Sequence, residues 1–166
     1  MKGLSAKELE LISSLEFEKK YFFTTVDIGA FVKNKTQRYN FIKNLVKKKR
    51  IIKLNKSKYF LIPIKAKTGG WSEHPLIVID EMMDGENYFI GGWAAANYWR
   101  LTDQIPFQYD VYTTKRQGKI TLFYARIIFH RTSKKRISYS TVKMINNHPF
   151  RIAPQSEMKT WIQSRE

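Results

Sequence analysis

The sequence contains no cysteine. Disulfide bonds, thiolate nucleophiles and cysteine-liganded zinc sites are therefore excluded. It also has no apolar run of about 18 residues, the length that a membrane-spanning helix needs. Its first ten residues, "MKGLSAKELE", are too polar for the hydrophobic part of a secretory signal. We expect a soluble, unexported, cytoplasmic protein with no membrane partner.

Acidic residues are missing from a long central stretch. None lies between Asp27 and Glu73, whereas 13 Lys and Arg lie between Lys33 and Lys67. Residues 1–68 hold 17 basic and 5 acidic residues, against 13 and 9 in the remainder, so most of the formal charge of +16 is in the first part. The positive charges of such a block repel one another unless a polyanion binds them. The block therefore predicts a nucleic-acid phosphate backbone or another anionic surface as the partner. A charged face that only aids solubility is the alternative.

The chain is long enough, at 166 residues with 43% hydrophobic content, to bury a core as one domain or as two small ones. Gly69 and Gly70 interrupt the segment 64–75, which we interpret as a loop or short linker. The predicted division is a domain over residues 1–65 and a small mixed α+β domain over residues 72–166. The predicted fold class is α+β.

Three helices are predicted from capping residues in the first part of the chain. Ser5 and Glu8 have the spacing of a capping box, so the first helix should begin at Ala6. The other helices should start after a threonine and an asparagine: Thr24 or Thr25 for the second, and Asn34, with Gln37 three residues on, for the third.

The third helix has two different faces at about 100° per residue. The side chains expected to pack are Tyr39, Phe41, Ile42, Leu45 and Val46, and those expected to point outward are Thr36, Gln37, Asn40, Lys43, Asn44 and Lys47. The outward set combines amides and a hydroxyl, which pair with base edges, and ammonium groups, which neutralise phosphates. An ordinary surface helix would carry both charge signs in Glu–Lys pairs. This face has none.

The segment "RIIKLNKSKYFLIP" predicts a β-hairpin with strands at 51–54 and 58–62 and a turn at 55–57. Three helices followed by a basic-tipped hairpin predict a winged helix-turn-helix, with the third helix in the major groove of DNA and the hairpin tip on the backbone. We expect Thr36, Gln37 and Asn40 to read bases. The full set of predicted DNA contacts is Lys35, Thr36, Gln37, Arg38, Asn40, Lys43, Asn44, Lys47, Lys48, Lys56 and Lys58.

The second part mixes helix and strand signals. Ser72 is the expected cap of a helix with Pro75 in its first turn, "NYFIGG" the expected strand and "WAAANYWRL" the next helix. The segments "FQYDVYTT", "KITLFYARIIFHR" and "RISYSTVKMI" are all interpreted as β structure. The aromatic residues Trp71, Trp93, Tyr98 and Trp99 either fill a small core or line a groove for a partner.

Enzymatic alternatives depend on a few carboxylates. Asp80 and Asp84 lie at i and i+4 and could hold Mg²⁺ in a nuclease. However, no neighbouring predicted strand carries the Asp or Glu and Lys that a nuclease site would add. The histidines are not spaced as metal ligands. The sequence also has no nucleophile elbow and no glycine-rich phosphate-binding loop. We expect a non-enzyme without catalytic residues, metal or cofactor. An RNA-binding or scaffolding protein remains an alternative.

The segment "YFIGGWAAANYWRLTDQIP" resembles a motif of the AbiEi-type antitoxins and related predicted transcriptional regulators of viral defence systems. The resemblance covers roughly Ser5 to Pro154. The helix-to-hairpin segment is similar to the family's pattern at Leu45, Val46 and Tyr59. Lys49 stands where the family has glycine, so we expect the tight turn to be made differently.

The resemblance implies a winged helix that binds DNA and represses its own operon. It also implies that the second domain acts as an antitoxin against a nucleotidyltransferase-type toxin. The segment "HPFRIAPQSEMKTWIQSRE" corresponds only to the beginning of a longer helical region in fuller members, so a stand-alone regulator without a toxin is the alternative. A winged helix reads few base pairs, so two copies, as a homodimer or as adjacent monomers, should bind an inverted repeat.

Overall fold

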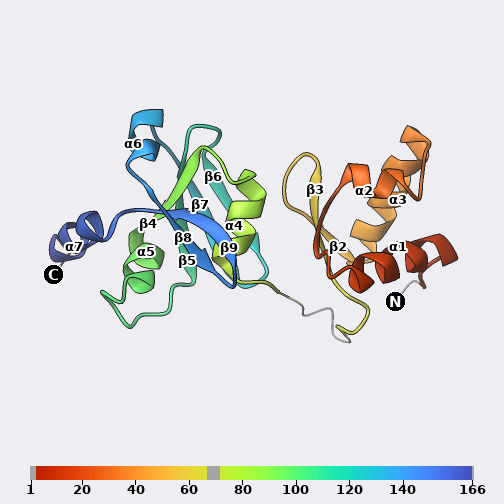
Figure 1. Ribbon diagram of the computed structural model, residues 1–166, viewed down its shortest axis with the longest axis horizontal. Coiled ribbons are helices and arrows are strands. Elements are labelled where there is room, and N and C mark those ends of the chain that lie inside the picture. Colours follow the sequence, from red (N-terminus) through yellow and green to blue (C-terminus); the bar gives the residue numbers. More distant parts are fainter. Residues whose placement is uncertain (1–2, 67–71, 166) are drawn as a thin grey trace. The chain divides into compact units, whose positions relative to one another are not determined.

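The computed structural model describes residues 3–66 and 72–165 (Figure 1). The chain divides into two compact units, residues 1–73 and 74–166. Both contain helices and strands, and the larger sheet is mixed, so the α+β prediction is confirmed. The linker glycines Gly69 and Gly70 and the aromatic residue Trp71 lie outside the described residues.

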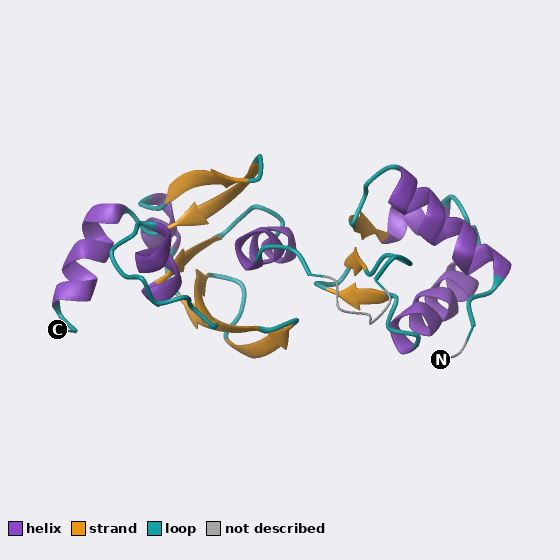
Figure 2. Ribbon diagram, turned by 90° about the horizontal axis from the view of Figure 1, so that it is seen from below, coloured by secondary structure: helices purple, strands orange, loops and turns teal. Residues whose placement is uncertain are grey.

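The first unit consists of helices joined to a small sheet (Figure 1). Its elements are α1 (Ala6–Phe17), β1 (Phe22–Thr24), α2 (Thr25–Gly29), α3 (Lys35–Lys47), β2 (Ile51–Lys53) and β3 (Lys58–Leu61). The strands pair antiparallel in the order β1-β3-β2, and the helices lie together beside them (Figure 2). The three predicted helices and the predicted hairpin are confirmed. Strand β1 was not predicted, because its three residues are too few for an alternating pattern.

Side-chain caps fix where these helices begin. The Ser5 amide donates to Glu8 at 2.6 Å and the Glu8 amide to the Ser5 hydroxyl at 3.3 Å, which confirms the capping box. Thr24, rather than Thr25, caps α2. The Asn34 side chain accepts hydrogen bonds from the first amides of α3. Local hydrogen bonding therefore sets all three starts, as the sequence indicates.

The first unit has its own core, to which α3 contributes Leu45, Phe41 and Ile42. Its buried members are Leu11, Ile12, Leu15, Phe23, Ile28, Leu45, Ile51, Tyr59 and Leu61. Tyr39 is 66% exposed and Val46 is 41% exposed, so the prediction that both pack inward is wrong. Leu45 is buried in this core, and Phe41 and Ile42 pack against it partly buried, as predicted, while a groove is left between α3 and the β2–β3 hairpin.

The second unit is built on a six-stranded mixed sheet. Its elements are α4 (Pro75–Met83), β4 (Tyr88–Gly91), α5 (Gly92–Tyr98), β5 (Gln108–Thr113), β6 (Gly118–Leu122), β7 (Ala125–Arg131), α6 (Lys134–Ser138), β8 (Thr141–Ile145), β9 (His148–Ile152) and α7 (Gln155–Gln163). The strand order is β6-β7-β5-β4-β9-β8. Strand β4 is antiparallel to β5 and parallel to β9, while β5 and β7 are parallel. Helix α4 packs against β9, and α5 packs against β4, β5 and α7.

Three predictions for this unit need correction. Helix α4 is capped by His74, whose Nδ1 accepts the Leu76 amide at 3.2 Å, and not by Ser72, which lies too far from the first turn. The first three residues of "RISYSTVKMI" are helical, because Ser133 accepts the Arg136 amide and caps α6. The long predicted β segment 119–131 is two strands that reverse at Phe123, which has φ 54°.

The paired glycines at the junction of β4 and α5 are explained by close neighbours. A Cβ on Gly91 would lie 2.8 Å from the ring of Tyr112. Gly92 has φ +61°, and a Cβ there would lie 2.6 Å from the Asp110 carboxylate. Only glycine leaves room for these two side chains and also adopts the positive φ at position 92 without strain. The two adjacent glycines of the family-like segment are therefore accounted for by packing.

The aromatic residues of α5 contact neighbouring elements. The Trp93 and Trp161 rings meet edge to face with centroids 5.2 Å apart, and Tyr98 meets Phe150 in the same way at 5.1 Å. The Trp99 indole donates to the Ala153 carbonyl at 2.8 Å. These contacts join α5 to β9 and α7, which supports the interpretation of the aromatic cluster as packing rather than as a groove.

Candidate nucleic-acid interface

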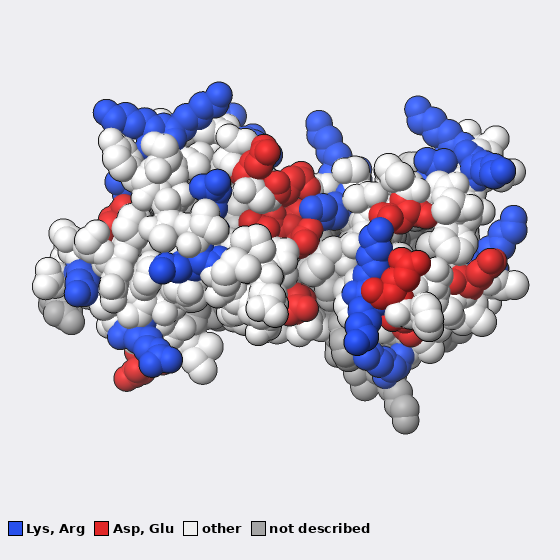
Figure 3. Space-filling view, in the orientation of Figure 1, with Lys and Arg blue, Asp and Glu red and all other residues white. Residues whose placement is uncertain are grey.

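One face of α3 is polar, basic and exposed. The residues predicted to point outward, namely Thr36, Gln37, Asn40, Lys43, Asn44 and Lys47, are all exposed, and so is Lys35. The helix carries no acidic residue. Figure 3 shows Lys and Arg side chains projecting from the start of α3 and from the β2–β3 turn, while the acidic side chains of this unit lie over α1 and α2. The exposed face of α3 is therefore basic and free of carboxylates, as the sequence indicates.

Arg38 lies at the edge of this face with its guanidinium directed inward. Its Nε donates to the Val32 carbonyl and its Nη2 to the Lys33 carbonyl, both at 3.1 Å. The guanidinium also lies within 3.2 Å of where a Cβ on Gly29 would be. Arg38 thus holds the turn between α2 and α3, and we remove it from the set of expected base or phosphate contacts.

Lys48 also differs from its predicted orientation. Its ammonium lies 2.6 Å from the carboxylate of Glu8, and the two side chains are only 17% and 3% exposed. Burial alone would raise the pKa of Glu8, but hydrogen bonds from Lys48 and Ser5 hold it below its ordinary value. Lys48 therefore joins the end of α3 to α1 and is not available to a phosphate.

Lys49 closes α3 in the conformation that glycine usually supplies. Its φ is 57°, its amide donates to the Val46 carbonyl at 2.9 Å, and the Arg50 amide donates to the Leu45 carbonyl at 3.0 Å. These two bonds form a Schellman motif. The expectation of a differently made turn is wrong: the lysine itself adopts the left-handed conformation.

The β2–β3 turn has a fixed shape that presents Lys56. The Asn55 side chain accepts the amides of Ser57 and Lys58 at 3.0 and 2.9 Å, and the Thr25 amide donates to the Ser57 carbonyl at 3.1 Å. The turn is therefore attached to the start of α2. Lys56 is exposed at its tip, while Lys58 is half-buried in β3.

A groove of about 530 Å³ lies between α3 and the β2–β3 hairpin. Its cationic lining residues are Lys35, Arg38, Lys43, Lys53 and Lys56, and the others are Thr25, Tyr39, Ile42, Val46 and Tyr59. None of these is acidic. Sequence reasoning missed Lys53, although it lies on the outward side of an alternating strand, and it assigned Tyr39 and Val46 to the core.

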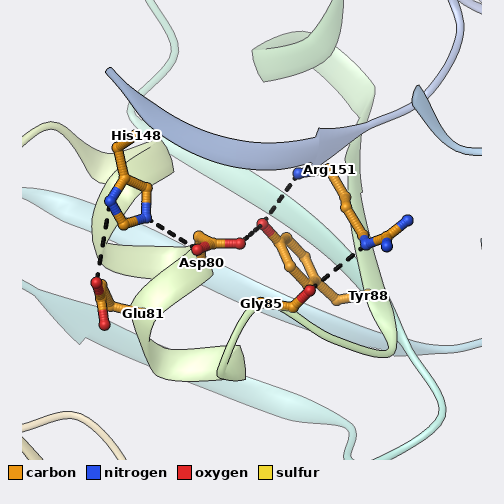
Figure 4. A network of polar contacts seen from close by, with 6 residues as sticks. All are labelled: Asp80, Glu81, Gly85, Tyr88, His148 and Arg151. Carbon is orange, nitrogen blue, oxygen red and sulfur yellow. Dashed lines mark hydrogen bonds and ion pairs between the residues drawn. The ribbon is translucent and has the colours of Figure 1, made fainter. Parts of the chain in front are cut away.

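Asp80, the centre of the nuclease alternative, belongs to a buried network in the second unit (Figure 4). Its Oδ1 accepts the Tyr88 hydroxyl at 2.7 Å, and its Oδ2 lies 2.9 Å from Nε2 of His148. The Tyr88 oxygen in turn accepts the Arg151 amide at 3.0 Å. Burial and the bond to Asp80 raise the pKa of Tyr88 far above its ordinary value. Both Asp80 oxygens thus connect α4 to β4 and β9.

A metal site is not assembled around these carboxylates in the described residues, where no group of three or more His, Asp or Glu is placed to hold an ion. Asp84 is the left-handed cap at the end of α4, with φ 58°. The structure therefore assigns both aspartates structural positions in α4 and its cap.

Comparison with protein-family models and with curated proteins finds no match to this sequence. Within residues 3–66 and 72–165, every helix is too short or too polar to cross a bilayer. The geometry of the first unit and the resemblance described above are therefore the grounds for a functional proposal.

Proposed function

We propose that the protein is a sequence-specific DNA-binding transcriptional repressor whose first unit acts as a winged helix-turn-helix. The observation that carries the proposal is the acid-free, exposed face of α3, which combines amides, a hydroxyl and lysines beside a lysine-tipped hairpin. In this role α3 enters the major groove and the β2–β3 hairpin is the wing. The order of helices and strands in the unit supports this assignment.

The residues of α3 divide into two roles. Thr36, Gln37 and Asn40 occupy the N-terminal half of the helix and carry the groups that bind base edges. The phosphate contacts are the lysines that the structure leaves exposed: Lys35, Lys43, Lys47 and Lys56. Asn44 lies on the same face and adds a further amide. Base contacts set sequence preference, and phosphate contacts set affinity and orientation.

The second unit is assigned by resemblance. We propose that it gives the protein an antitoxin function against a nucleotidyltransferase-type toxin, and that the repressor regulates its own operon. Two copies on an inverted repeat would supply the specificity that one small reading helix lacks. A regulator without a toxin shares the DNA-binding part of this proposal. Co-expression with a nucleotidyltransferase gene adjacent to its own separates the two, since only the antitoxin restores growth.

The central experiment is titration of the protein against the duplex upstream of its own gene over a range of salt concentrations. We expect specific binding that weakens with a log–log slope of about −0.9 per neutralised phosphate. Single-stranded RNA of equal length and the same duplex with Mg²⁺ serve as comparisons. Preferred RNA binding, or magnesium-dependent cleavage, contradicts the proposal.

The base-reading assignment is tested by Thr36→Ala, Gln37→Ala and Asn40→Ala. Removing a bidentate base contact should reduce discrimination between operator and random duplex by about 1–3 kcal/mol. Ser13→Ala on the exposed side of α1 is the control. Equal weakening on all sequences would show that these side chains do not read bases.

A further inference from the structure

The groove between α3 and the β2–β3 hairpin lies beside the base-reading residues but is formed by different side chains. Its apolar part comes from Tyr39, Ile42 and Val46, and its rim includes Lys43, Lys53 and Lys56. Tyr39 is 66% exposed and Val46 41% exposed, although both continue the apolar side of the helix. Large apolar side chains left open between cations indicate a ligand that is both apolar and anionic.

The length of the groove restricts what this ligand is. The lining residues of α3 extend from Lys35 to Val46, which at 1.5 Å per residue is about 16 Å. A run of several nucleotides fills that length, whereas a single nucleotide does not. The absence of any carboxylate from the lining residues removes the main source of repulsion against a chain of phosphates.

We propose that this groove holds the sugar–phosphate backbone of one strand of duplex DNA. The ammonium groups of Lys43, Lys53 and Lys56 neutralise phosphates, and Tyr39 and Val46 pack against the deoxyribose between them. This inference rests on the proposed function and extends it, because it adds Lys53, Tyr39 and Val46 to the interface. It also explains why two apolar residues of α3 are exposed.

Substituting the lysines of the groove and substituting its apolar side chains should change DNA binding in different ways. Replacing Lys43, Lys53 and Lys56 together by glutamine should make the salt slope shallower by about 0.9 for each phosphate that is no longer neutralised. Tyr39→Ala should weaken binding to every duplex alike by roughly tenfold while leaving the slope unchanged, because it removes packing and no charge. Tyr39→Phe keeps the ring and should bind normally.

Matched controls are available in the same chain. Tyr139→Ala removes a tyrosine that is 61% exposed in the second unit. Lys7→Gln removes one charge at an exposed position of α1 in the first unit. Circular dichroism of each variant checks that the fold is retained, and Tyr39→Phe tests the hydroxyl separately from the ring.

The outcomes separate the two proposals. If Tyr39→Ala binds normally while the Thr36, Gln37 and Asn40 variants lose discrimination, the groove assignment is overturned and the repressor assignment stands. A larger loss on single-stranded than on duplex DNA also overturns it, because the groove would then hold an unpaired strand. If the unaltered protein binds no duplex, both proposals fail.

Discussion

Lys49 is in the left-handed backbone region at the end of α3, where glycine carries no steric penalty. For a residue with a side chain this conformation costs about 1–2 kcal/mol. The surrounding Schellman bonds maintain it, since both amides that follow the helix are satisfied by its carbonyls. The protein therefore keeps a lysine in a strained backbone conformation at the end of α3, next to its exposed basic face.

We predict that Lys49→Gly raises the free energy of unfolding by about 0.5–1 kcal/mol, the strain relieved less the larger chain entropy of unfolded glycine. Urea unfolding measures the change. The matched variant is Lys43→Gly, in the middle of α3, which should lower stability by about 1 kcal/mol. A loss of stability in Lys49→Gly would show that the charge at the helix end outweighs the backbone strain.

Glu8 makes stability depend on pH. Its pKa is lower in the folded protein than its ordinary value of 4.5, so its contribution is complete above that value and is lost as pH falls through the folded pKa. Glu8→Gln should cost about 2 kcal/mol at neutral pH, because Lys48 loses its charged partner. As the pH falls below 4.5, the variant should then lose less stability than the unaltered protein.

Unfolding at a series of pH values tests this, with Glu10→Gln as the control, since Glu10 is exposed on the same helix. Parallel pH profiles for Glu8→Gln and the unaltered protein would contradict the predicted role of this carboxylate.

At the scale of the element, the junction of β4 and α5 depends on two glycines. Gly92→Ala adds a Cβ where the Asp110 carboxylate lies and also forces alanine into a positive φ. We predict a loss of at least about 2 kcal/mol. In the background of Asp110→Ala, the same substitution should cost less, because only the backbone strain remains.

The comparison is a double-mutant cycle followed by urea unfolding. Gly3→Ala is the control, since no heavy atom lies within 4 Å of its added Cβ. Equal costs of Gly92→Ala in both backgrounds would exclude the carboxylate as the source of crowding.

Helix α3 shows how far the sequence predicts an interface. Its start, its length and its exposed polar set follow from Asn34 and the helical period, which are local features. The roles of Arg38 and Lys48 do not follow, because their partners are the carbonyls of a preceding turn and a carboxylate on α1. The exposure of Tyr39 and Val46 could not be predicted either, since periodicity locates the apolar side but not the width of its contact.

For the whole molecule, the α+β class follows from local patterns, but the sheet does not. Strand β9 is inserted between β4 and β8, and its parallel pairing with β4 brings Ile90 beside Ile152. Hydrophobic patterning does not encode which distant strands pair. The prediction also missed Ser133, whose hydroxyl caps a short helix that extends into the first residues of a segment interpreted as strand.

The two units should respond separately to damage in either core. Leu45 is fully buried in the core of the first unit, and Leu45→Ala should cost about 3 kcal/mol. We predict that hydrogen exchange then accelerates in α1, α3 and β3 and is unchanged in β4 and β5. Ile79→Ala, at a buried position of α4, should produce the reverse pattern. Faster exchange in both units of either variant would indicate one cooperative molecule.

The late position of β9 along the chain affects how the protein is made on the ribosome. The first unit is complete when residue 66 has been synthesised, and it can acquire its structure while the rest is translated. The second unit must wait until Ile152 emerges, and until then one edge of β4 lacks its neighbour. A premature stop before β9 would therefore release a chain with a folded first unit and an exposed edge on β4. Such an edge is prone to pair with other chains and aggregate.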